Sequence, residues 1–138
     1  MWAEWVAQNR VDATTRDPAT WLRCDAAAPR LARRAVERLE EIRAIREDAL
    51  LLTSELASNA VARSGFDPGE EIELRAELLP DGVRILVRGE GRSRRRPILR
   101  ALDPDRPGRL GLGVVQTVSR QWGSERDDGM CVWAEIAF

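Results

Sequence analysis

The spacing of apolar residues in the first half of the chain predicts one short strand and two helices. Residues 19–24 are expected to form the strand, and Pro29 then stands where the first turn of a helix tolerates proline. Apolar residues follow at steps of four, four and three, the spacing of one buried helix face. They are Leu31, Ala35, Leu39 and Ile42. A second helix is predicted from about Glu47 to Arg63 and ends at Ser64-Gly65, because glycine is common just beyond a helix.

The next segment alternates strictly between apolar and charged residues, which indicates a strand with one buried face. Its predicted buried side chains are Ile72, Leu74, Ala76 and Leu78, and they alternate with Glu71, Glu73, Arg75 and Glu77. Pro80-Asp81-Gly82 has the composition of a turn. Alternation resumes through Val83, Ile85 and Val87, so the two strands are expected to form a hairpin.

The last third of the chain is less regular. Residues 89–109 contain three prolines and several arginines without periodicity, and we expect a long loop there. A third helix is predicted from an apolar face that ends at Gly123, and its members are Leu112, Val115, Val118 and Trp122. Residues 127–129 then predict a turn into a last strand. Its two alternating sets are Val132, Ala134, Ile136 and Phe138, and Cys131, Trp133 and Glu135.

This order of elements is strand, two helices, hairpin, loop, helix and hairpin. Helices in such an order can all lie on one face of the sheet. We therefore expect an α/β fold of the α+β type, a two-layer sandwich with its helices on one face of a mostly antiparallel mixed sheet. Residues 1–138 are expected to form a single domain, with residues 1–16 as a leader outside the core.

The composition of the chain excludes several kinds of active site. The chain has 138 residues, 33% of them charged, and a formal net charge of −1, so no overall field attracts it to nucleic acid or to an anionic membrane. It contains neither histidine nor lysine, which excludes a histidine-based triad and the lysine of a Walker-type phosphate loop. Cys24 and Cys131 are far apart in sequence and form no metal-type cluster. Any catalytic base is therefore a carboxylate, and without a signal peptide the chain is expected to be cytoplasmic.

Glu55 and Asn59 are the first candidate functional pair. They lie four residues apart on the second predicted helix, so they are neighbours on its surface. At 100° per residue they lie nearly opposite the predicted core side, whose members are Ala49, Thr53, Leu56, Ala57 and Ala60. Such a pair can supply a general base and a ligand for Mg²⁺. Taken alone, the pair is better explained as two polar residues on the solvated face of an amphipathic helix.

Two glycine-rich segments are the other candidates. Gly89-Glu90-Gly91 follows a strand, where glycine permits close approach of a ligand to the backbone. Residues 108–113, with the sequence GRLGLG, lead directly into the third helix, whose first backbone N–H groups suit phosphate. Each segment alone is also compatible with an ordinary flexible junction.

In this order, the motifs resemble the Bergerat ATP-binding fold of the GHKL superfamily, which includes gyrase, Hsp90, MutL and histidine kinase catalytic domains. The resemblance covers about residues 19–138 and is strongest to the short actinobacterial anti-sigma-factor serine kinases. Those carry a Ser-Glu-Leu-x-x-Asn-Ala-Val run, which stands here at residues 54–61 as SELASNAV. Trp122-Gly123 and Val132-Trp133 match further features of that group.

The resemblance implies that Glu55 is the catalytic base and that Asn59 coordinates Mg²⁺ across the phosphates of ATP. It also implies a set of nucleotide-binding residues, namely Asn59, Ala62, Arg63, Gly89, Gly91, Leu110, Gly111, Leu112 and Gly113. The implied function is to bind a sigma factor and to phosphorylate a serine of a STAS-type anti-anti-sigma protein. No direct nucleic-acid or membrane partner is implied, and a homodimer is left open.

The chain departs from the family pattern at Gly89. That position is normally the aspartate of an Asp-x-Gly-x-Gly box, which contacts the adenine amino group, and Glu90 points the other way out of a strand. Arg109 also stands where a further glycine is common. The alternative is therefore a pseudo-kinase, a binding module of the same fold with weak or lost ATP binding. A third hypothesis is that the chain is a detached histidine-kinase catalytic domain.

Residues 89–109 would form the lid of such a site. Their basic run, residues 92–96 with the sequence RSRRR, is suited to contact phosphates or the acidic surface of a partner. A solvated segment explains the same run equally well.

Overall fold

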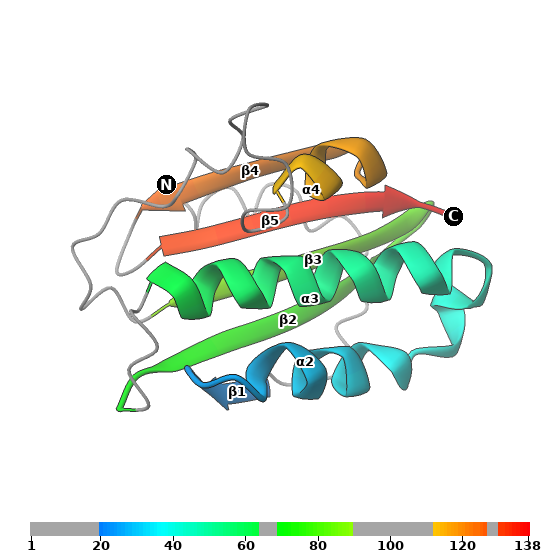
Figure 1. Cartoon of the computed structure of the whole chain (residues 1–138). Helices are drawn as coiled ribbons and strands as arrows, with labels where there is room; N and C mark the ends of the chain where they lie inside the picture. Colours follow the sequence, from blue (N-terminus) through cyan, green and yellow to red (C-terminus); the bar gives the residue numbers. More distant parts are fainter. Residues whose placement is uncertain (1–19, 64–68, 90–111, 127–129) are drawn as a thin grey trace.

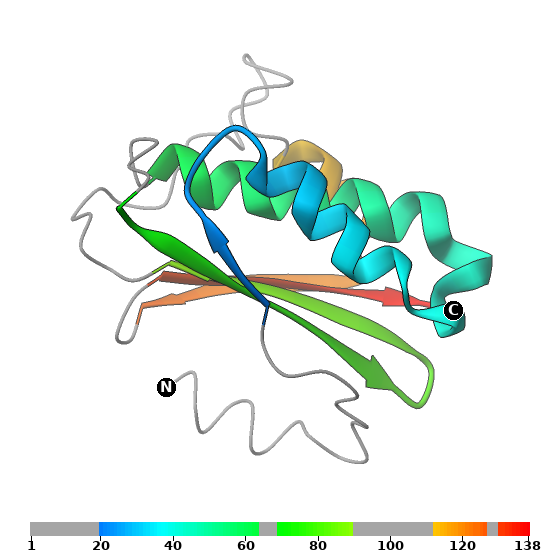
Figure 2. The same ribbon diagram turned by 90° about the horizontal axis from the view of Figure 1, so that it is seen from below.

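The protein is a five-stranded sheet with its helices on one face, as Figures 1 and 2 show for this computed structural model. The structure describes residues 20–63, 69–89, 112–126 and 130–138. The elements are β1 (Thr20–Arg23), α2 (Ala28–Glu37), the 3-10 helix η1 (Glu40–Ile45), α3 (Arg46–Arg63), β2 (Glu71–Leu79), β3 (Gly82–Gly89), α4 (Leu112–Val118), β4 (Gln121–Arg126) and β5 (Met130–Ala137).

The strand order across the sheet is β1-β2-β3-β5-β4, and each neighbouring pair is antiparallel. The predicted two-layer sandwich of the α+β type is confirmed. The sheet was expected to be mixed, but the described strands contain antiparallel pairs alone. The chain crosses from β3 to β5 through α4 and β4, and β3 is the middle strand of the sheet, between β2 and β5.

The main core lies between the sheet and α3. The sequence placed four apolar side chains and Thr53 of α3 on the core side, and all five are buried. The apolar ones share one core cluster with the alternating valines and isoleucine of β3. The buried members of these two elements include Ala49, Leu56, Ala57, Ala60, Val83, Ile85 and Val87. Burial of this kind contributes roughly 25 cal/mol per Å² of apolar surface, so α3 is fixed on the sheet mainly by this contact.

The predicted buried face of the first helix was only partly right, since Ile42 is buried and Ala35 and Leu39 pack against the core, but Leu31 does not. The side chains of α2 that enter the core are Ala28, Ala32 and Val36, while Leu31 is 38% exposed. Leu39 and Ile42 lie beyond α2, because the chain leaves α-helical geometry at Arg38 and continues as η1. Small alanines let α2 approach the sheet and α3 closely, so tertiary packing selected this stripe over the larger apolar residues.

The third helix is shorter than the sequence predicted. It ends at Val118, whereas Trp122 and Gly123 belong to β4 and pair with Ala134 and Trp133 of β5. An ideal Cβ at Gly123 would lie 2.8 Å from the Trp133 ring. Gly123 therefore makes room for a side chain of the neighbouring strand and does not end a helix.

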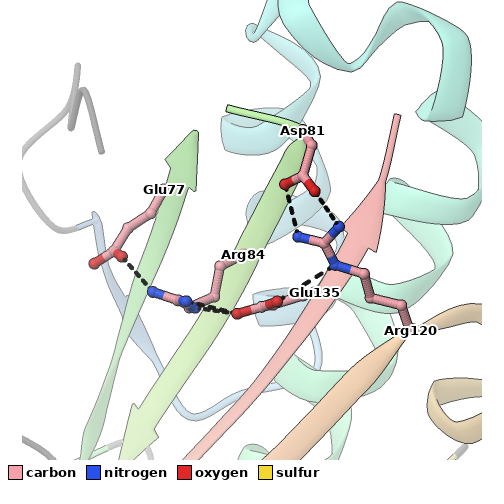
Figure 3. A network of polar contacts seen from close by, with 5 residues as sticks. All are labelled: Glu77, Asp81, Arg84, Arg120 and Glu135. Atoms are coloured by element: carbon pink, nitrogen blue, oxygen red, sulfur yellow. Dashed lines mark hydrogen bonds and ion pairs between the residues drawn. The ribbon is translucent and has the colours of Figure 1, made fainter. Parts of the chain in front are cut away.

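The sheet face away from the helices is also largely buried, which the alternating pattern did not predict. We call this the second face and define it by Leu86, Cys131 and Trp133, which form a separate apolar cluster, with Glu73, Glu77, Arg84 and Glu135 around them. Figure 3 shows Arg84 of β3 between two carboxylates, Glu77 on β2 and Glu135 on β5. The acidic residues of β2 that were expected in solvent are thus partly internal.

Several sequence predictions lie outside the described residues. They are the leader at residues 1–16, the helix stop at Ser64-Gly65, the loop beyond Gly89 and the turn at residues 127–129. Within the described ranges, no helix has the length and apolar character needed to cross a membrane.

Candidate functional site

Asn59 lies inside the protein, not on the outer surface of its helix. Its side chain is 0% exposed, so the prediction that it faces nearly opposite the core was wrong for this residue. At 100° per residue, Asn59 lies only about 100° from the centre of the buried side of α3. Leu52 is seven residues earlier, hence on nearly the same stripe, and is also 0% exposed. That spacing was the available signal for the burial of Asn59.

Within the described residues, neither Oδ1 nor Nδ2 of the buried Asn59 amide has a hydrogen-bond partner. Two other buried polar side chains of α3 behave differently. Thr53 Oγ1 donates to the carbonyl of Ala49 at 2.7 Å, and Ser54 Oγ donates to the carbonyl of Leu51 at 3.0 Å. A buried polar group without a partner costs about 1–3 kcal/mol. The unsatisfied amide of Asn59 is therefore a feature that folding alone does not explain.

Glu55 lies one helical turn before Asn59 and is half-buried. Burial raises the pKa of its carboxyl group above the ordinary value of 4.5. Among the contacts of the described residues, none joins this carboxylate to a hydrogen-bond donor or a cation. A carboxylate that is partly desolvated and unpaired has the properties of a general base, because it holds a proton more readily than a solvated one.

The start of α4 lies beside α3. Figure 1 shows α4 beginning near the middle of α3, with its first turn toward the end of the sheet where β3 finishes at Gly89. The described part of the third motif thus lies next to the helix that carries Glu55 and Asn59. An ideal Cβ at Gly89 or at Gly113 meets nothing within 4 Å, so space is open beside both glycines.

Two further predicted site residues, Ala62 and Arg63, are the last two residues of α3. Ala62 is half-buried, and Arg63 ends the helix as a buried cation. Burial lowers the pKa of Arg63 to about 10, while the nearby Cys131 and Cys24 act in the opposite direction. Arg63 therefore carries its charge at neutral pH. It supplies positive charge at the same end of α3 as Asn59.

The remaining predicted site residues are only partly placed. Leu112 is the first residue of α4. Gly91, Leu110 and Gly111 lie outside the described residues. Of the described site residues, the structure places the pair Glu55 and Asn59 on α3, and α4 packs beside that helix.

The chemistry of these residues fits a magnesium ion shared with phosphates. In the described part of the chain, no three Cys, Asp or Glu residues gather as a metal site, so a cage made only of protein ligands is not formed there. Mg²⁺ usually takes one or two protein oxygens and completes its shell with water and substrate phosphates. The Oδ1 atom of Asn59, which has no hydrogen-bond partner among the described residues, has the chemistry of such a ligand.

No protein-family model matches the chain, and no curated protein sequence matches it significantly.

Proposed function

We propose that this chain is an ATP-binding protein related to the anti-sigma-factor serine kinases of the GHKL superfamily. Its proposed activity is the transfer of a phosphoryl group from Mg-ATP to a serine of a STAS-type anti-anti-sigma protein. Its second proposed role is to bind a sigma factor and so regulate transcription in the cytoplasm. The fold is compatible with this class, since it has helices on one face of an antiparallel sheet.

The observation that carries the proposal is the buried, unsatisfied amide of Asn59 one turn from Glu55. A ligand that bonds to the amide would offset the cost of leaving it unpaired. A cation held by Oδ1 and by phosphate oxygens is a suitable ligand. Without a ligand, the buried Asn59 remains a destabilising feature.

In the proposed reaction, Glu55 accepts the proton of the substrate serine hydroxyl. The serine oxygen then forms a bond to the γ-phosphorus as the bond to the β-phosphate oxygen breaks, and ADP leaves. The raised pKa of Glu55 suits this role, because a base with higher affinity for the proton removes it more effectively. When bound, Mg²⁺ would neutralise the charge that develops on the phosphate oxygens.

Calorimetric titration with Mg-ATP tests the binding site. We expect measurable binding in the intact chain and a loss of roughly tenfold or more in Asn59→Ala. Ser58→Ala is the matched control, since Ser58 precedes Asn59 and is half-buried. Equal affinity in Asn59→Ala and Ser58→Ala contradicts the assignment of Asn59.

Phosphorylation of purified STAS-domain proteins tests the activity. The intact chain should transfer the label from ATP, and Glu55→Gln should reduce the rate by roughly 100-fold or more, the usual contribution of a general base. If Glu55→Gln transfers the label as fast as the intact chain, Glu55 is not the base.

Gly89 favours a second candidate, the pseudo-kinase. The residue at this position has no side chain to contact an adenine amino group, and neither its φ angle nor the space around it requires glycine. In this second candidate, the chain has the same fold but binds its protein partner without ATP. Titration separates the two, because a pseudo-kinase binds Mg-ATP weakly or not at all while it still binds its partner.

A further inference from the structure

The surface of α2 that faces away from the sheet is basic. It exposes Arg30, Arg34 and the C-cap residue Arg38, which follow one another at four-residue steps and so form one stripe along the helix. The one carboxylate of the helix, Glu37, is paired with Arg46. Among the described residues, no ion pair joins any of the three arginines to a carboxylate. The stripe therefore presents positive charge that its own helix does not neutralise.

The outer surface of the first half of α3 is acidic. Glu47, Asp48 and Leu51 are all exposed, and at 100° per residue both carboxylates lie within about 60° of Leu51. The two basic residues of α3 do not offset this charge, because Arg46 is paired with a residue of α2 and Arg63 is buried at the other end of the helix. This part of α3 therefore carries negative charge of its own.

The basic and the acidic surface lie side by side in the helix layer. The chain turns back through η1 between the two helices, so α2 and α3 are in contact and run in opposite directions, as Figure 1 shows. Arg38 therefore stands at the same end of the layer as Glu47 and Asp48. Each helix also exposes a leucine, since Leu31 of α2 is 38% exposed and Leu51 of α3 is 41% exposed. The layer thus has a basic half and an acidic half, each with some apolar area.

A layer of this kind is complementary to a second copy of itself. When two copies face each other about a two-fold axis that runs along the helices, α2 of each copy lies over α3 of the other, and both contacts join basic to acidic charge. An axis across the helices would place α2 over α2, where like charges repel. We propose that two copies of this chain associate through their helix layers in the first arrangement. Arg34 and Arg38 of each copy then lie against Glu47 and Asp48 of the other.

The distribution of charge favours a second copy over a polyanion as the partner. The chain has a formal net charge of −1, and the acidic surface of α3 borders the arginine stripe of α2. A DNA backbone or an anionic membrane extends beyond the stripe and would be repelled by that acidic surface. The interface uses the first half of α3, whereas Glu55 and Asn59 stand in its second half. The association therefore does not depend on the proposed activity.

Sedimentation equilibrium of the full chain tests the association. Exposed ion pairs are screened by salt, so the dimer should weaken by roughly tenfold or more between about 0.05 M and about 0.5 M salt. Arg34→Glu with Arg38→Glu makes α2 acidic, and Glu47→Arg with Asp48→Arg makes the first half of α3 basic. Each double variant alone should be monomeric, because both of its contacts would join like charges.

A mixture of the two double variants separates this interface from any other. The acidic α2 of one variant then meets the basic α3 of the other, and the second contact is complementary as well, so a one-to-one heterodimer should form. Arg23→Glu is the control and should dimerise like the intact chain. Arg23 is exposed and follows the core residue Leu22 on β1, so it projects from the sheet face away from the helices.

Four results would overturn the proposal. The intact chain stays monomeric or forms a dimer that is insensitive to salt, either double variant still dimerises by itself, the mixture does not associate, or a monomeric intact chain binds duplex DNA or vesicles of anionic lipid. The last result would identify a polyanion as the partner of the arginine stripe.

Discussion

Arg84 and Glu135 face each other on β3 and β5 and are joined by two contacts. The Nε and Nη2 atoms of Arg84 lie 2.9 Å and 2.5 Å from the same oxygen, Oε1 of Glu135. The Nη1 atom of Arg84 reaches Oε2 of Glu77 at 3.2 Å on the other side. All three side chains are buried, so one guanidinium links the three central strands β2, β3 and β5 from the second face (Figure 3).

Arg84→Met should be strongly destabilising. Removing the cation leaves two carboxylates buried near each other, and breaking a buried ion pair from one side costs about 3–5 kcal/mol. Urea unfolding measures the loss. Adding Glu77→Gln and Glu135→Gln to Arg84→Met should recover part of the stability, because the buried carboxylate charges that Arg84 balanced are then gone. A loss below about 1 kcal/mol for Arg84→Met alone would falsify the buried network.

Gly123→Ala should destabilise the β4-β5 pair. The added Cβ would lie 2.8 Å from the Trp133 ring, and an overpacked site of this kind costs about 1–3 kcal/mol. Gly89→Ala is the matched control, since its Cβ meets nothing within 4 Å. Thermal unfolding of both variants should show a clearly lower midpoint for Gly123→Ala only. Equal midpoints would mean that the Trp133 ring moves aside freely.

Gly89→Asp should strengthen ATP binding if the proposed function is correct. The open space at this position accommodates the side chain, and the new carboxylate can accept a hydrogen bond from the adenine amino group. A hydrogen bond to a charged group contributes about 1.5–3 kcal/mol, or roughly ten- to over a hundredfold in affinity. Titration with ATP and with GTP, which lacks that amino group, checks the origin of the gain. An equal gain for both nucleotides contradicts adenine recognition at residue 89.

The rate of phosphoryl transfer at acidic pH should follow the protonation of Glu55. Its pKa is raised above 4.5 by burial, so the deprotonated base is lost at a higher pH than for a solvated glutamate. The rate of the intact chain should therefore fall, as the pH is lowered, at a pH above 4.5. A pH profile of the rate measures this limb. A limb at or below the ordinary glutamate value would contradict the role of Glu55.

The contact between Asp81 and Arg120 should appear as pH-dependent stability in acid. The hydrogen bonds from Arg120, at 2.8 and 2.9 Å, hold the pKa of Asp81 below its ordinary value of 3.8. A depressed carboxyl pKa stabilises the fold above the unfolded pKa and ceases to do so as the pH falls through the folded pKa. Arg120→Gln should return the Asp81 pKa toward 3.8, which NMR titration of the carboxyl carbon measures. A titration curve unchanged by Arg120→Gln would show that another group holds the pKa down.

The sequence determined the elements whose patterns are local. Alternation in β2 and β3 and the helical period of α3 follow from backbone geometry, so the hairpin, the long helix and its core side were predictable from spacing alone. The motif order was also visible in the sequence, including the pairing of Glu55 with Asn59 on one helix.

Tertiary structure decided what lies against each element. Spacing placed Leu31 in the core and Asn59 outside, whereas packing exposes the first and buries the second. Gly123 was interpreted as a helix stop because the pattern of one segment does not reveal that Trp133, ten residues later, lies across it in β5. The buried second face escaped prediction for the same reason. The alternation within a strand assigns its residues to two faces, but only contacts with distant parts of the chain determine whether one or both faces are buried.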